Sequence, residues 1–220
     1  MTERCDRHID GLGHAGFSLV ETLIAVVISS IVLLGLYLLY DVNQATFIRG
    51  EQQTDLQQNA RIGMDRLVRE LRMAGNDPSG ALAVAGTGIL TADSTEVVFV
   101  ADIDSDGTTE KVGYICRDGG GTLCTIQDPA EIRRETCNWD EITTAWVGCT
   151  GYRELATRAT ALTFAYYDGG GAPLATPVPA GSLDTIQRIA VTITTADTVT
   201  GTVPQPFTLQ AHIRPRNLGL

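Results

Sequence analysis

Lysine is almost missing from this chain of 220 residues: Lys111 is its only lysine, and 16 basic residues face 26 acidic residues for a formal net charge of -10. Nucleic-acid binding needs a positive surface to meet the phosphates, so this balance disfavours a general nucleic-acid-binding protein. Charged residues make up 19% of the chain and hydrophobic residues 44%. That composition is typical of a protein that folds, and it excludes a disordered polymer or a membrane protein with many spans.

Catalytic motifs are also missing. The chain has no P-loop and no complete G-x-G-x-x-G, and none of its serines stands in a G-x-S-x-G context. After residue 16 the only histidine is His212, which falls on the polar face of a predicted strand. We therefore expect no enzymatic activity and no required cofactor.

One long apolar run stands out in the sequence. From Leu23 to Tyr40 no residue is charged, over a length that suits a transmembrane helix. A cleaved secretory signal fits poorly, because its apolar stretch is only about 7 to 15 residues long and no A-x-A pattern follows here before Asp41. An uncleaved membrane anchor fits the length. It does not explain Glu21, since an ionised side chain in an apolar segment is costly unless it is paired or near the interface.

A cut in the chain would give Glu21 a partner. Cleavage between Gly16 and Phe17 creates a free α-amino group, and this cation on one subunit can meet Glu21 of a neighbour. Glu21 also falls in the first turn of the predicted helix, where the helix dipole favours negative charge. Both arguments indicate a chain that assembles with others.

The residues GFSLVETLIAVVISSIVLLGLYLLY resemble the class III leader junction and N-terminal helix of type IV pilins and type II secretion pseudopilins. The resemblance implies that prepilin peptidase cuts after Gly16, that Phe17 is N-methylated, and that Glu21 helps to dock subunits. It implies membrane lipid around the helix before assembly, and an inner-membrane assembly platform as a partner. The leader, residues 1–16, departs from the family because its two arginines are outnumbered by its acidic residues.

The next segment, residues 41–75, keeps a helical rhythm. The segment has no net charge, and its arginines are expected on a solvated or subunit-facing edge. Because the first proline after Phe17 is Pro78, one helix of about 58 residues is predicted, with residues 17–40 in membrane or filament core. Small and apolar residues recur every three or four positions, at Leu56, Ala60, Gly63, Leu67, Leu71 and Ala74.

Residues 76–220 are predicted to form an exported head rich in β-structure. A long helix followed by mainly antiparallel strands is an α+β plan, and here it is pilin-like, with the second half of the helix packed on the sheet. Strands with a period of two residues are expected at Val97–Ala101, Lys111–Cys116, Ala161–Tyr167, Ile186–Thr195 and Pro206–Ile213.

Three further stretches narrow the resemblance to PilW-type minor pilins: QQNARIGMDRLVRELRMAGNDPSG, VADIDSDGTTEKVGY and HIRPRNL. J-type pseudopilins of type II secretion share a related arginine-rich helix and are the alternative. The PilW resemblance implies a subunit that primes a type IV pilus near its tip, with other minor and major pilins as partners. It implies an inner-membrane location with the head in the periplasm, and a place in the pilus at the cell surface after assembly.

The cysteines favour export. Cys5 belongs to the leader, and Cys116, Cys124, Cys137 and Cys149 remain, an even number that suits a domain folding in the periplasm. Three disulfide connectivities are possible, and pairing each cysteine with its neighbour in sequence would close two short loops. A zinc site is disfavoured, because the chain has no C-x-x-C spacing and no histidine near these cysteines.

An acidic loop offers a candidate calcium site. Asp102, Asp104 and Asp106 occupy alternate positions before a glycine, and Glu110 follows, as in the opening of an EF-hand loop. The loop departs from a full EF-hand because its twelfth position is Gly113 and a hairpin flanks it. The alternative is an acidic, soluble hairpin loop, and both interpretations stay open.

Two pairs of residues bear on other possible functions, adhesion and DNA uptake. Trp139 and Trp146 lie between two cysteines, where packing is favoured over an adhesive patch. A calcium-dependent adhesive domain on a simple membrane anchor is nevertheless the alternative from another class. Arg133 and Arg134 could form a small basic patch, which is the one feature that favours DNA uptake by a tip pilin. No nucleic-acid partner is expected from the acidic head.

Overall fold

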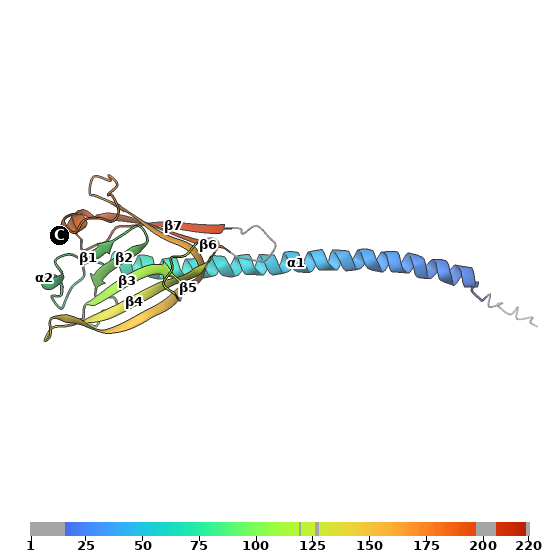
Figure 1. Cartoon of the computed structure of the whole chain (residues 1–220), viewed down its shortest axis with the longest axis horizontal. Helices are drawn as coiled ribbons and strands as arrows, with labels where there is room; N and C mark the ends of the chain where they lie inside the picture. The colour runs from blue at the N-terminus through green and yellow to red at the C-terminus, as the bar shows by residue number, and fades with distance from the viewer. Residues whose placement is uncertain (1–15, 119, 126–127, 197–205, 219–220) are drawn as a thin grey trace, which may run out of the picture. The chain divides into compact units, whose positions relative to one another are not determined.

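The computed structural model describes residues 16–118, 120–125, 128–196 and 206–218 (Figure 1). The chain divides into two compact units, Met1–Gly50 and Glu51–Leu220, and each is described by itself. The predicted leader lies outside the described residues except for Gly16.

The first unit contains the apolar part of helix α1, which extends from Leu19 to Arg72. The helix begins two residues after the predicted Phe17, because Ser18 caps it: the Ser18 hydroxyl oxygen accepts the backbone N–H of Glu21 at 3.2 Å. A serine followed by a glutamate three positions later is a typical helix start. Every side chain from Phe17 to Gly50 is exposed.

The remaining part of α1, from Glu51 to Arg72, belongs to the second unit and buries one face. All six positions of the predicted apolar stripe are buried, which confirms the helical periodicity. At Gly63 a Cβ atom would lie 3.1 Å from the Cβ of Ala156, so a glycine permits the close approach of helix and sheet. After the helix, Gly75 adopts a left-handed φ of +85°, which turns the chain away from the helix axis.

Within the described residues, seven antiparallel strands form one sheet, and each strand pairs with its neighbours in chain order. Figure 1 shows β2 to β5 lying side by side in that order. A short helix, α2 (Leu82–Ala85), precedes the sheet, and a 3-10 helix, η1 (Ala180–Thr185), precedes β6. The strands are β1 (Ile89–Ala92), β2 (Glu96–Ala101), β3 (Glu110–Arg117), β4 (Ala130–Asp140), β5 (Ala145–Tyr167), β6 (Arg188–Ala196) and β7 (Pro206–Ile213).

Four of the predicted strands, β2, β3, β6 and β7, match the structure to within two residues at each end. In β7 the predicted alternation is also confirmed, with Ile213 buried and His212 exposed. The prediction missed β1, β4 and the first half of β5. The pairing of β4 with β5 shifts register at several points, and these irregularities break the period of two that marks a strand in a sequence.

The core of the second unit lies between helix α1 and the sheet. Leu67 and Leu71 of the helix pack with fully buried aromatic rings of the sheet, Phe99 and Tyr114. This is an α+β fold with the helix packed on an antiparallel sheet, as predicted. A smaller apolar cluster joins Trp139 to Ala81 and Val100, with Trp146 packed against it, so packing is confirmed as a role of both tryptophans.

Candidate functional site

The predicted processing junction lies directly before helix α1. Gly16, Phe17 and Ser18 are in no regular structure, and the Phe17 side chain is 80% exposed. Glu21 stands in the first turn of the helix, where its charge favours the positive end of the helix dipole. Within the described part of the chain, no cation forms a salt bridge with the Glu21 carboxylate.

Among the described residues, α1 is the one helix long and apolar enough to cross a membrane by length and composition. Two hydroxyl groups within its apolar half pair with backbone carbonyl oxygens of the same helix. The Thr22 hydroxyl donates to the Ser18 carbonyl oxygen at 3.1 Å, and the Ser30 hydroxyl donates to the Val27 carbonyl oxygen at 2.7 Å. This segment can therefore enter an apolar environment without leaving these hydroxyl groups unpaired.

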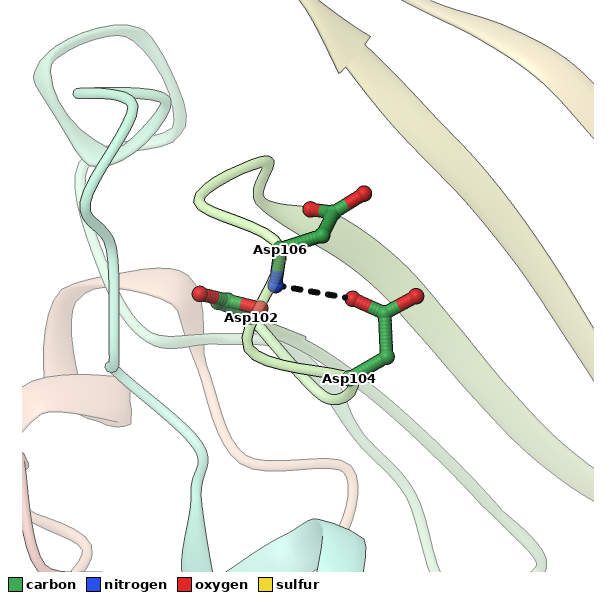
Figure 2. Close-up of side chains that lie close together, drawn as sticks. All are labelled: Asp102, Asp104 and Asp106. Atoms are coloured by element: carbon green, nitrogen blue, oxygen red, sulfur yellow. Dashed lines mark hydrogen bonds between the residues drawn. The ribbon is translucent and has the colours of Figure 1, made fainter.

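The acidic loop connects β2 to β3 and gathers three of its four predicted ligands. Carboxylate oxygens of Asp102, Asp104 and Asp106 lie within 4.8 Å of one another (Figure 2). Asp102 is buried, whereas Asp104 and Asp106 are exposed. The turn needs a left-handed backbone at Gly107, with φ of +90°, and this explains the glycine after the last aspartate.

Backbone N–H groups hold the three carboxylates in place. Asp102 accepts from Ser105 at 2.7 Å and from Gly107 at 3.3 Å. Asp104 accepts from the N–H of Asp106 at 3.2 Å, the bond drawn in Figure 2. Each carboxylate keeps further lone pairs, so the donor set is oxygen-only and suits a hard cation such as calcium.

Glu110 is not part of this group of three. Its Oε2 atom accepts the backbone N–H of Ile103 at 3.0 Å, so it closes the same loop from the first position of β3. Burial raises the pKa of Glu110 to about 6, and the hydrogen bond from Ile103 opposes that shift. The negative charges of Asp104, Asp106 and Asp102 raise the pKa further.

The described residues contain two disulfides that include cysteines of the sheet. Each joins cysteines that are neighbours in sequence, which is one of the three connectivities that the sequence left open. Cys116 is bonded to Cys124, eight residues later, and Cys137 to Cys149, twelve residues later. The second bond joins β4 to β5, in the region where the register between these strands is irregular. Each disulfide closes a short loop. Even a cross-link over a short loop lowers the conformational entropy of the unfolded chain and so stabilises the folded state.

A buried charged network joins helix α1 to the sheet, and sequence reasoning missed it. Glu70 is 6% exposed, and its Oε2 accepts from Arg134 Nε at 2.8 Å and from the Tyr114 hydroxyl at 2.6 Å. Its Oε1 accepts from Arg66 Nε at 2.9 Å. Burial, together with the charge of Glu70, raises the pKa of Tyr114 well above its ordinary value. A signal existed in the sequence, because Glu70 follows Leu67 by three residues and therefore falls on the apolar face.

The small basic patch that Arg133 and Arg134 could have formed is not present. Arg134 is buried against Glu70, and Arg133 pairs with Glu131 at 3.2 Å. Both guanidinium groups are thus neutralised by carboxylates of the chain. The feature that favoured DNA uptake is thus corrected, because Arg133 and Arg134 are successive residues of β4 and point to opposite faces of the sheet.

The N-terminus of the chain matches a known protein family. Residues 12–37 match the family described as the prokaryotic N-terminal methylation motif, a range that contains Gly16, Phe17 and Glu21. Among solved structures, a type IV-like pilin from Thermus thermophilus matches with 12% sequence identity and a TM-score of 0.47, over 75% of this chain and 97% of that chain. No curated protein matches the chain.

Proposed function

We propose that this chain, whose N-terminal methylation motif supports the type IV pilin superfamily, is a pilin-like subunit that assembles into a filament and catalyses no reaction. The observation that carries the proposal is the coincidence of that motif with the start of a helix whose apolar side chains are all exposed from Leu19 to Ile48. Exposed apolar surface on this scale needs cover from lipid or from neighbouring subunits. A filament core provides that cover after the helix leaves the membrane.

Processing is proposed at the Gly16–Phe17 bond, followed by N-methylation of Phe17. The Gly16–Phe17 bond lies outside regular secondary structure, which supports cleavage there, because a peptidase needs access to the backbone on both sides of the bond that it cuts. The new α-amino group of Phe17 then pairs with Glu21 of a neighbouring subunit. In an apolar surrounding this ion pair is much stronger than in water, so it favours the correct axial alignment of the helices.

The finer assignment is a PilW-type minor pilin that primes a type IV pilus near its tip. Two of the segments that carry the PilW resemblance contact each other: the Arg216 N–H donates to the Arg72 carbonyl oxygen at 3.1 Å, and Gly75 lies against Asn217. The partners are then prepilin peptidase, the inner-membrane assembly platform, and other minor and major pilins. The location is the inner membrane with the head in the periplasm, and later the pilus. A J-like pseudopilin is the alternative, favoured by the arginine-rich helix.

Calcium binding by Asp102, Asp104 and Asp106 is proposed for the acidic loop, with Glu110 supporting the loop from β3. The convergence of three carboxylates within 4.8 Å supports it. The test is calorimetry on the full chain in detergent with calcium and with magnesium. It compares Asp104→Asn/Asp106→Asn with the matched control Asp65→Asn/Asp184→Asn, which removes the same charge at exposed positions outside the loop. Loss of calcium heat in the loop variant alone supports the site. If the unaltered chain shows no heat and no melting shift at millimolar calcium, the loop is only a solubilising hairpin.

The test of the proposed function is N-terminal sequencing with intact mass on membrane-extracted protein, from cells with and without prepilin peptidase. A start at methylated Phe17 that disappears without the peptidase supports the filament subunit. An intact Met1, or a cut beyond Tyr40, favours the membrane-anchored, calcium-dependent adhesive domain instead. Cross-linking in cells then separates the two machines, because a PilW-type subunit yields links to pilus subunits and a J-like one to secretion pseudopilins.

Assembly itself is tested with Glu21→Ala and a matched control, Glu51→Ala, in which an exposed glutamate farther along α1 is replaced. The first variant is expected to be processed normally but to be lost from filaments. The second is expected to assemble like the unaltered chain. Equal incorporation of both variants contradicts the docking role of Glu21.

A further inference from the structure

A cavity of about 420 Å³ in the second unit has an unusual lining. Among the described residues, all its charged side chains are basic and no carboxylate lines it. The lining is Arg72, Arg188, His212, Ile213, Arg214 and Arg216, called here the arginine pocket. So dense a group of cations in a chain with net charge -10 calls for an explanation.

Strand periodicity builds one side of the arginine pocket. Along the end of β7 and the residues after it, Ile213 and Pro215 are buried, while His212, Arg214 and Arg216 are exposed. Because alternate residues of an extended chain point to the same side, these three basic groups share one face. The two buried residues between them fix the segment that carries the charges.

The other two arginines come from separate elements. Arg188 precedes Ile189, whose register partner is Ile213, so Arg188 lies beside Arg214 across neighbouring strands. Its guanidinium stacks on the ring of Tyr167 at 4.0 Å from the centroid, which holds it in one orientation. Arg72 ends helix α1, and its carbonyl oxygen accepts the N–H of Arg216, so the helix end is tied to the strand segment.

These arginines have no anionic partner in the described chain. The salt bridges of the described residues use Arg66, Arg133 and Arg134, and none involves an arginine of the pocket. Like charges on neighbouring strands repel and destabilise the fold. A bound anion would remove that repulsion.

We propose that the arginine pocket binds a compact oxyanion with two or more negative charges, of the phosphate type. Arginine presents a planar set of N–H donors that matches phosphate oxygens in a bidentate way, and arginines from three elements can surround one such group. A compact ligand is favoured over a nucleic acid, because the acidic remainder of the chain repels an extended polyanion. This inference does not depend on the proposed filament function.

The experiment measures binding to the full chain in a neutral detergent by calorimetry, together with thermal unfolding at matched ionic strength. Its probes are inorganic phosphate, a sugar phosphate monoester and a single-stranded oligonucleotide, with chloride as the reference anion. The test variant is Arg214→Gln/Arg216→Gln. The matched control is Arg61→Gln/Arg153→Gln, which loses the same charge at exposed positions outside the pocket.

We expect phosphate to raise the unfolding temperature of the unaltered chain and of the control. We expect it to bind the test variant at least about tenfold more weakly than the unaltered chain, since two charge-assisted hydrogen-bonding groups are lost. In chloride at low salt, the test variant should unfold at an equal or higher temperature, because a repulsion is removed. If it unfolds earlier, the single change Arg214→Gln serves in its place. If the sugar phosphate monoester binds more tightly than inorganic phosphate, the natural ligand is a phosphate group carried by a larger molecule. If the two bind equally, the natural ligand is the free phosphate ion.

Three results overturn the inference. The first is an absence of phosphate binding to the unaltered chain. The second is equal weakening in the test and control variants, which means that net charge alone is sensed. The third is binding of the oligonucleotide without binding of phosphate, which would make the pocket part of an extended polyanion surface.

Discussion

Replacing Glu70 by glutamine removes the negative charge that holds helix α1 to the sheet while keeping the shape of the side chain. In the native chain the Glu70 carboxylate accepts from Arg134, Tyr114 and Arg66. The Arg134 side chain is only 10% exposed, so its charge cannot turn to water when the carboxylate is lost. Glu70→Gln therefore leaves a buried cation without an anion.

The magnitude follows from burial. Breaking a buried ion pair by removing one partner destabilises a protein by about 3 to 5 kcal/mol. In a chain of 220 residues that loss corresponds to a fall in unfolding temperature of about 6 to 20 °C. The Arg66 side chain is 45% exposed, so Arg66→Gln removes a surface pair of the same carboxylate and should change stability by only about 0 to 1 kcal/mol.

Near-ultraviolet circular dichroism against temperature is the assay, because Tyr114 reports on the packing of the network. Tyr114→Phe is an intermediate case, with an expected loss of about 1.5 to 3 kcal/mol for one hydrogen bond to a charged group. The double variant Glu70→Gln/Arg134→Met should recover part of the loss, since no buried charge is left unpaired and the half-exposed Arg66 can be hydrated. If Glu70→Gln costs no more than Arg66→Gln, the network does not hold the helix and the reasoning is wrong.

Three other expectations follow from the structure. Replacing Cys137 and Cys149 by serine, which opens a bond across twelve residues, should lower the free energy of unfolding by about 3 kcal/mol; denaturant midpoints without reductant measure this, and equal midpoints refute it. Because the pKa of Glu110 is raised from 4.5 to about 6, its contribution to stability is present below pH 4.5 and lost as the pH rises through 6. In the presence of a chelator, Glu110→Gln should lack this part of the pH dependence of melting, and a profile unchanged by the substitution contradicts it. Gly63→Val should destabilise the chain by about 1 to 3 kcal/mol, because its Cβ would meet Ala156 at 3.1 Å. Gly50→Val, whose added Cβ would meet no atom of another element within 4 Å, is the control, and equal melting of both variants excludes a tight helix contact.

Most of the fold could be predicted from sequence patterns that lie within a single helix or strand. The spacing of Leu56 to Ala74 identified the buried face of α1, and the alternation from Phe207 to Ile213 identified the last strand. The resemblance of the GFSLVE junction to the type IV pilin superfamily is supported by the motif match at residues 12–37. These signals are local, because each is written within one helix or one strand.

The parts that could not be predicted depend on contacts between distant segments. Glu70 meets Arg134 and Tyr114, which are register partners on β3 and β4, and that register is set by the whole sheet. The arginine pocket likewise needs the pairing of β6 with β7 and the end of α1. For the acidic loop, the spacing of its aspartates predicted their convergence, but it did not show that Glu110 would lie outside the group of three.

The contact between the end of α1 and the segment Arg216–Leu218 bears on the order in which the head is completed. Asn217 lies against Gly75, and Leu218 lies against Gly88. Helix α1 lies far ahead of these residues in the chain, so the helix end stays uncovered until the sheet has formed and this segment has docked. In a chain that lacks this segment, the end of α1 and the neighbouring Gly75 and Gly88 stay uncovered. We expect chains that lack this segment to be cleaved by proteases more readily than chains that carry it.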